Sequence, residues 1–248
     1  MDRGSPRGFT VIETMLFLAV SGLLIMGILI GSGGAINAQR YKDATNSLLS
    51  YFQSQYDRVA NVQNLRDTDL GCATGGTELT VSDTAIPRGT TDCVIIGRLL
   101  VASDSGESIS ARTVYASSDL SNSFSESGAQ LGGDVEVIKN SGLFIDDDLG
   151  ESRDYAPEWN TRLVQAGTSD PDAWQILIVR SPASGSIRTY ISDDTGLSLV
   201  DLVDASNEGQ RLICLDSRGL VMSGNRGVVF SAGSTGGSGV KLVGDGQC

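Results

Sequence analysis

The sequence contains no histidine among its 248 residues. Histidine is the usual base that activates serine and cysteine nucleophiles, and it is also the commonest metal ligand in proteins. Its absence excludes Ser-His and Cys-His catalysis and removes the first choice of ligand for a metal site. No other catalytic constellation stands out, so we expect a protein that is not an enzyme and that has no cofactor.

Basic residues are also scarce, because 18 Lys and Arg stand against 30 Asp and Glu, which gives a net charge of −12. Proteins that bind nucleic acid normally neutralise several phosphates with Lys or Arg, so this balance argues against DNA or RNA as partners. The segment after Gly209 is locally basic, and we interpret its cations as solvated turn residues. They are Arg211, Arg218, Arg226 and Lys241.

Two short segments hint at ligand sites but lack residues that such sites need. Residues 146–150 (DDDLG) suggest a calcium loop, yet the EF-hand pattern needs its glycine one place later and a glutamate where Pro157 stands. Residues 232–239 (AGSTGGSG) suggest a phosphate-binding loop, yet Lys241 follows Val240, so no G-K-[ST] element exists. We expect a solvated acidic loop and a flexible loop at these two places.

The chain has one long hydrophobic run, residues 9–30, interrupted only by Thr10, Glu13, Thr14 and Ser21. As a helix it would be about 33 Å long, enough to cross a hydrocarbon layer of about 30 Å. The run is too long for the hydrophobic region of a secretory signal, and no A-x-A-like cleavage site follows it. It therefore predicts a membrane-spanning helix.

A plain signal anchor is one interpretation of this helix, with Arg3 and Arg7 holding the N-terminus in the cytoplasm. A simple anchor gains nothing from Glu13, because a carboxylate inside a membrane helix costs on the order of a few kcal/mol. An ionisable residue at such a position indicates a function, and this favours an interpretation that gives Glu13 a partner.

The residues that precede this acid form a specific motif. A short basic leader ends at Gly8, Phe9 and Thr10 begin the apolar run, and Glu13 follows. This resembles the N-terminus of prepilins, the precursors of type IV pilins and of type II secretion pseudopilins. The resemblance implies that prepilin peptidase cleaves after Gly8, that the new N-terminal Phe9 is methylated, and that Glu13 guides assembly.

Cleavage after Gly8 would leave a free, positively charged amine on Phe9. In a growing filament that amine can approach Glu13 of a neighbouring subunit. Pairing of the two charges in a low-dielectric core strongly favours correct register between subunits.

The helical pattern continues beyond the apolar run. After a glycine-rich break at residues 31–34, a stripe recurs at three- or four-residue spacing, which is typical of a helix that packs on a domain. The stripe consists of Tyr41, Thr45, Leu48, Phe52, Tyr56 and Val59. We predict one helix from Phe9 to about Leu65, roughly 85 Å long.

Residues 66–248 are enough for one sizeable core or for two small lobes. Segments of β type lie at residues 93–102, 134–139, 174–180, 187–191 and 197–203, and a meander is predicted from residues 211–216, 220–223 and 228–232. We predict an α+β fold in which an antiparallel sheet packs on the amphipathic half of the helix. The predicted divisions are a cleaved leader (1–8), a transmembrane and filament-core helix (9–31), its amphipathic continuation (32–65) and a β-rich head (66–248).

All four cysteines, Cys72, Cys93, Cys214 and Cys248, lie beyond the membrane segment. An even number of cysteines in an exported domain indicates disulfides, and four cysteines permit three pairings. Zinc is the alternative, but the chain has neither a C-x2-C pair nor a histidine. We predict the local pairs Cys72–Cys93 and Cys214–Cys248, the second of which resembles the C-terminal disulfide loop of many type IV pilins.

The resemblance implies a single-pass precursor in the inner membrane, with its N-terminus in the cytoplasm and its head outside. Prepilin peptidase and an inner-membrane assembly platform would convert it into a subunit of an extracellular helical filament of identical or related pilins. Adhesion, motility or DNA uptake are the roles open to such a filament.

Other functions stay open at this point. The chain can be a major pilin, a minor pilin or a secretion pseudopilin, and its large head favours a minor subunit slightly. A membrane-anchored adhesin or binding module is the alternative from another class. Residues 117–133, rich in Ser, Asn and Gly, would suit its contacts.

Overall fold

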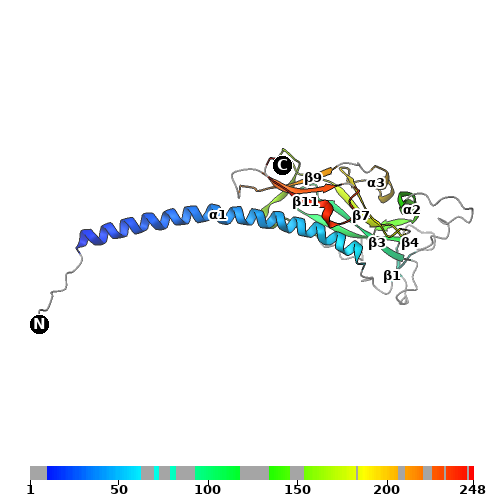
Figure 1. Cartoon of the computed structure of the whole chain (residues 1–248), viewed down its shortest axis with the longest axis horizontal. Helices are drawn as coiled ribbons and strands as arrows, with labels where there is room; N and C mark the ends of the chain where they lie inside the picture. Colours follow the sequence, from blue (N-terminus) through cyan, green and yellow to red (C-terminus); the bar gives the residue numbers. More distant parts are fainter. Residues whose placement is uncertain are drawn as a thin grey trace, which may run out of the picture.

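The computed structural model describes residues 10–62, 70–72, 79–81, 93–117, 134–145, 154–182, 184–205, 210–219, 225–231, 233–244 and 246–248. A long N-terminal helix projects from a head built of β-strands and short helices, so the molecule is strongly elongated (Figure 1). This arrangement confirms the predicted α+β class, with a long apolar N-terminal helix and antiparallel sheets.

Helix α1 (Val11–Ala60) is continuous over 50 residues, about 75 Å at about 1.5 Å per residue. Thr10 caps its N-terminus, and Asn61 ends it by donating its backbone N–H to the carbonyl of Asp57. The glycines at residues 31–34 do not interrupt it, although each costs about 1 kcal/mol relative to alanine. The helix ends a few residues before the predicted limit at Leu65.

The head contains two main antiparallel sheets. The five-stranded sheet has the order β5 (Leu143–Ile145), β4 (Ile109–Ser117), β3 (Cys93–Ala102), β7 (Gln175–Arg180) and β8 (Ile187–Ser192). The four-stranded sheet has the order β11 (Val240–Val243), β10 (Arg226–Ser231), β9 (Gln210–Asp216) and β6 (Arg162–Val164). A separate two-stranded ribbon pairs β1 (Leu70–Cys72) with β2 (Leu79–Val81).

Two segments that were predicted as strands are helices instead. Residues 134–139 belong to α2 (Asp134–Asn140), and residues 197–203 overlap α3 (Leu199–Ala205). In α3 the buried Leu199, Leu202 and Val203 have helical spacing, and the Ser198 hydroxyl accepts a hydrogen bond from the Asp201 N–H, 3.2 Å away. Tertiary packing on one face therefore outweighs the β-type composition of these short segments.

The meander at the C-terminal end also differs from the prediction. Strands β9 and β10 are direct neighbours, and β11 follows β10, so these three strands form the meander. Residues 220–223, which were predicted as its middle strand, lie outside the described residues. The glycine-rich segment after β10, predicted as a flexible loop, contains the short 3-10 helix η3 (Gly237–Gly239), which contacts α1.

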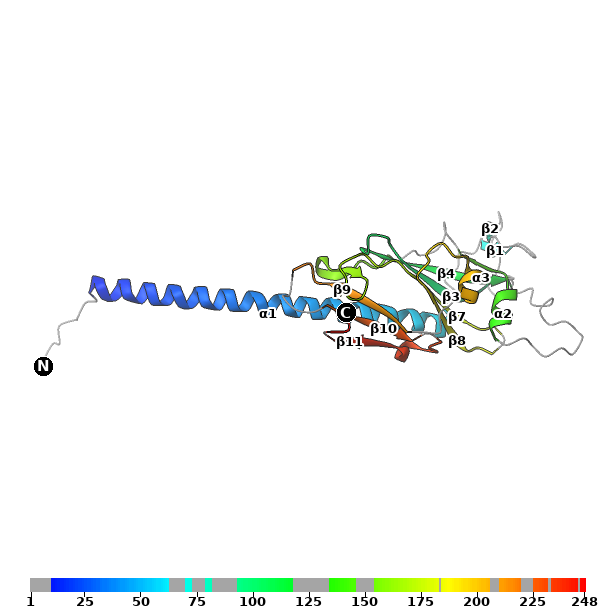
Figure 2. The same ribbon diagram turned by 90° about the horizontal axis from the view of Figure 1, so that it is seen from above.

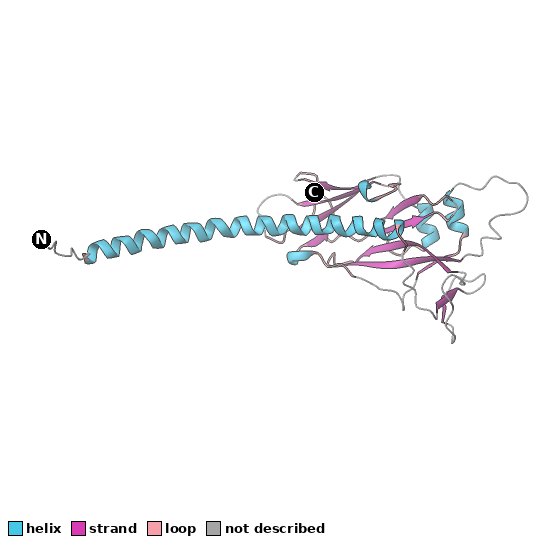
Figure 3. Ribbon diagram, turned by 60° about the horizontal axis from the view of Figure 1, so that its bottom comes forward, coloured by secondary structure: helices cyan, strands magenta, loops and turns pink. Residues whose placement is uncertain are grey.

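The second half of α1 lies across both sheets, as Figure 3 shows. Phe52 is fully buried at the centre of this core. Its ring centroid lies 4.6 Å from that of Phe230 in the four-stranded sheet and 5.9 Å from that of Trp174, which precedes β7. One helical face thus joins the two sheets, and the predicted stripe from Tyr41 to Val59 is buried.

A second core occupies the opposite face of the five-stranded sheet. There Leu177 and Val179 of β7 pack with Ile138 of α2 and with Leu202 of α3. The five-stranded sheet is therefore covered by α1 on one face and by the two short helices on the other (Figure 2).

Candidate functional site

The apolar side chains on the first half of α1 are exposed, because the rest of the described chain does not cover them. Its large apolar residues are exposed by fractions that run from 50% at Val20 to 77% at Ile12. They are Val11, Ile12, Met15, Leu16, Phe17, Leu18, Val20, Leu23, Leu24, Ile25, Met26, Ile28, Leu29 and Ile30. An exposed apolar surface of this extent marks an interaction with protein or membrane.

By length and composition alone, α1 is the one helix in the described part of the chain that could cross a membrane. Each buried side chain of this kind contributes about 1.5–3 kcal/mol, so an apolar environment would stabilise the projecting segment strongly. The apolar surface surrounds the helix rather than following one stripe, which is typical of a segment buried on every side.

Glu13 lies in the first turn of α1. Its backbone N–H donates to the hydroxyl of Thr10, 3.3 Å away, which is the N-cap interaction. The partial positive charge at the helix N-terminus favours an acidic side chain here. Gly8 and Phe9 lie outside the described residues, so cleavage, methylation and the pairing of Phe9 with Glu13 stay predictions.

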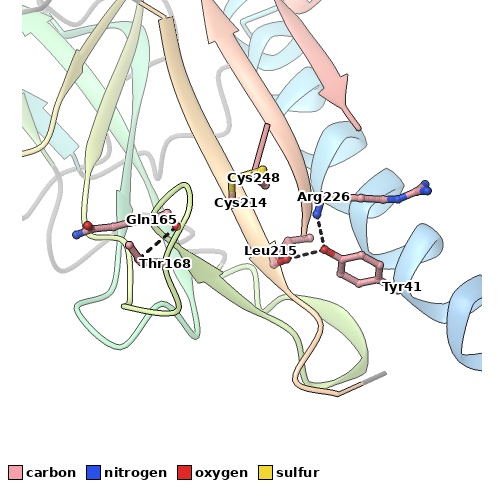
Figure 4. Close-up of a disulfide and its surroundings, with 7 residues drawn as sticks. All are labelled: Tyr41, Gln165, Thr168, Cys214, Leu215, Arg226 and Cys248. Atoms are coloured by element: carbon pink, nitrogen blue, oxygen red, sulfur yellow. Dashed lines mark hydrogen bonds between the residues drawn. A yellow bond between two sulfur atoms is a disulfide. The ribbon is translucent and has the colours of Figure 1, made fainter. Parts of the chain in front are cut away.

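Tyr41 fixes α1 to the head at the start of the buried half. Its hydroxyl donates to the carbonyl of Leu215 at 2.6 Å and accepts a hydrogen bond from the backbone N–H of Arg226. Leu215 and Arg226 face each other across β9 and β10, so Tyr41 closes the end of this strand pair (Figure 4). The sequence placed Tyr41 in the apolar stripe but gave no sign of these hydrogen bonds.

The structure contains the predicted Cys214–Cys248 disulfide, which joins β9 to the C-terminal residue. The Cα atoms are 5.6 Å apart, and Cys214 is fully buried. The carbonyl of Cys248 also accepts a hydrogen bond from the backbone N–H of Gly167 at 3.0 Å. The side chains of Cys72 and Cys93 lie outside the described residues, so their pairing stays a prediction.

The basic residues near the C-terminal end are not all the solvated turn residues that we predicted. Arg211 lies in β9 and forms ion pairs with the buried Asp172 and with Asp193. Burial raises the pKa of the Asp172 carboxyl, and the neighbouring Arg211 guanidinium partly offsets this. The Arg211 side chain therefore joins β9 to the segments that flank β7 and β8.

Arg218 is the one of these cations that does lie in a turn. It adopts a positive φ of 44°, and its guanidinium donates to Asn160 and pairs with Glu107 at 2.9 Å. Arg226 and Lys241 lie in strands β10 and β11.

No group of three or more metal-binding side chains occurs within the residues that the structure describes. The acidic segment at residues 146–150 lies outside them. Comparisons with protein-family models, with curated proteins and with solved structures gave no match. The candidate site is therefore defined by the geometry of α1: an exposed apolar half, an acid at its start and a buried half that holds the head.

Proposed function

We propose that this chain is a structural subunit of a type IV pilus or of a pilus-like filament, such as a secretion pseudopilus. The observation that carries the proposal is the division of one continuous helix into two halves. The half before the head exposes apolar side chains all round, and the half within the head is buried on one face. A subunit that first resides in a membrane and then packs helix to helix needs both halves.

The two stages use the same apolar surface. In the membrane, the apolar residues of α1 that follow Glu13 lie in the hydrocarbon layer and leave the acidic head outside. In the filament, the same side chains pack against the helices of neighbouring subunits, and the heads form the outer coat. Each stage removes this surface from water, so transfer between membrane and filament avoids a large hydrophobic cost.

Glu13 sets the register in this scheme. After cleavage by prepilin peptidase, the amine of Phe9 in one subunit pairs with Glu13 of its neighbour. A carboxylate in an apolar environment is costly unless it is paired, so subunits that bring the two charges together are favoured. An inner-membrane assembly platform then adds each subunit to the growing filament.

Gly8, the residue before the proposed cleavage point, has no side chain, so a bulky substitution there gives a direct test. Gly8→Val should block processing, so that a full-length precursor accumulates in cells that express prepilin peptidase. Gly4→Val is the matched control, because it makes the same change within the leader and away from the cleavage point. Immunoblots that show equal processing of both variants would contradict the proposal.

A further inference from the structure

One corner of the head lies directly beside α1 where the helix enters it. The short 3-10 helix η2 (Glu158–Asn160) packs against α1, and it lies at the end of the head from which the helix projects (Figure 2). The guanidinium carbon of Arg40 lies 4.9 Å from the ring centroid of Trp159. Trp159 is 47% exposed, whereas Trp174, the other tryptophan, is fully buried.

The backbone at this corner is strained. Trp159 has φ 58° and ψ 34°, and Asn160 has φ 59°. The left-handed region costs roughly 1–2 kcal/mol for a residue with a side chain, and it is unusual for a bulky one. Strain of this kind persists where the surroundings enforce it, often at functional positions.

Several hydrogen bonds enforce the conformation. The hydroxyl of Thr161 donates to the carbonyl of Glu158 at 2.8 Å, and Arg218 donates to the Asn160 side chain at 3.2 Å. The Ser47 hydroxyl on α1 donates to the Glu158 carboxylate at 3.0 Å. The corner is therefore tied both to α1 and to the turn after β9, and it presents a large aromatic side chain that the core does not use.

The depth of this corner follows from the position of the membrane span. Large apolar side chains of α1 stay exposed as far as Ile36, and the next two residues, Asn37 and Ala38, are partly buried. With Glu13 at one membrane surface, residues 14–36 extend about 35 Å, which fills a hydrocarbon layer of about 30 Å with modest tilt. Arg40 then lies about 6 Å further along the axis, within the headgroup layer.

We infer that the corner formed by Arg40, Trp159 and Arg218 seats the head in the phospholipid headgroup layer before assembly. Tryptophan prefers this interface, since its ring is apolar and its indole N–H needs a polar partner. Arg40 stacks on the ring while its charge can reach lipid phosphate. Arg218 is already paired with Glu107, so it supports the corner rather than supplying free charge.

This inference rests on the membrane stage of the proposed function, and it adds a defined orientation of the head relative to the membrane. The span alone fixes depth and leaves the helix free to rotate about its axis. An off-axis aromatic anchor at the interface limits that rotation and sets which side of the head faces the membrane.

Tryptophan fluorescence tests the inference, because Trp174→Phe makes Trp159 the only tryptophan of the full chain. The variant is reconstituted into vesicles of phosphatidylcholine and phosphatidylglycerol that contain lipid brominated either near the headgroup or near the tail end. We expect strong quenching by the first lipid and weak quenching by the second. Arg40→Gln should reduce the quenching, and Trp159→Phe, which keeps only the buried Trp174, should abolish it.

Resistance to carbonate extraction separates the two claims. If carbonate extracts the protein, the chain is not inserted in the membrane, and both the membrane stage and the inference are wrong. If the protein is inserted but Trp159 is not quenched by the lipid brominated near the headgroup, the proposed function stands and the inference is overturned. A Trp159 that is protected only in assembled filaments would assign the corner to subunit contacts instead.

Discussion

Tyr41 has two roles in the head. Its ring lies in the main core, and its hydroxyl bonds the ends of two strands. Tyr41→Phe should lower the free energy of unfolding of the head by about 1–3 kcal/mol, because the Leu215 carbonyl and the Arg226 N–H lose their partner. Urea denaturation of the full chain in detergent measures the effect.

Tyr51→Phe is the matched control for this prediction. The Tyr51 hydroxyl is buried without a hydrogen-bond partner among the described residues. Its removal should be neutral or stabilising, since it deletes a buried polar group that gains nothing from the fold. Equal losses from both variants would contradict the role that we assign to the Tyr41 hydroxyl.

Asp172 gives the head a pH dependence of known sign. Burial raises the pKa of its carboxyl above the ordinary value, so the folded protein binds this proton more tightly than the unfolded chain does. The resulting stabilisation is present at low pH and is lost as the pH rises through the raised pKa. Wild type should therefore lose stability relative to Asp172→Asn as the pH rises above about 4.

Urea midpoints measured at several pH values check this difference. Asp170→Asn, in the exposed loop just before, controls for the general effect of removing a carboxylate. A wild-type protein that instead gains stability relative to Asp172→Asn as the pH rises would show that the Arg211 ion pair outweighs burial.

The Cys214–Cys248 bond connects a central strand to the chain end, with a separation of 34 residues. Replacing both cysteines by alanine should lower the free energy of unfolding by about 3–4 kcal/mol, because the unfolded chain regains loop freedom. Thermal or urea unfolding of the full chain measures the loss. Gln247→Ala changes the same chain end and keeps the disulfide, so an equal loss in that variant would attribute the effect to something else.

Sequence periodicity correctly predicted the elements whose patterns are long and consistent. The spacing from Tyr41 to Val59 identified the buried face of α1, and strand β3 has the predicted bounds. The short segments that became α2 and α3 carry β-type residues in a helical arrangement, and only the facing sheet decides between the two. The prediction of element type was therefore wrong where the local pattern is short and tertiary packing decides between helix and strand.

The candidate site shows the same limit. Glu13 was predicted because the motif that contains it is local, and the structure places it in the first turn of α1 without testing its role in assembly. The hydrogen bonds of Tyr41 join residues 174 or more positions apart, and the Trp159 corner depends on contacts with Arg40 and Arg218. Sequence periodicity holds no information about such distant partners.

The molecule as a whole has an apolar projecting helix and a head that carries most of its acidic residues. The apolar side chains of the projecting helix are poorly solvated by water, whereas the acidic head is well solvated. The helix and the head therefore favour different environments. A filament with helices inside and heads outside satisfies both, and so does a membrane with the head above it. The account therefore predicts one chain that occupies these two environments in sequence.

Intact-mass spectrometry of the protein in filaments sheared mechanically from the cell surface tests this account most directly. The account predicts a species that begins at methylated Phe9, with the mass reduced by the hydrogens lost in disulfide formation. A protein found only in membranes, with the leader from Met1 to Gly8 still attached, would contradict it.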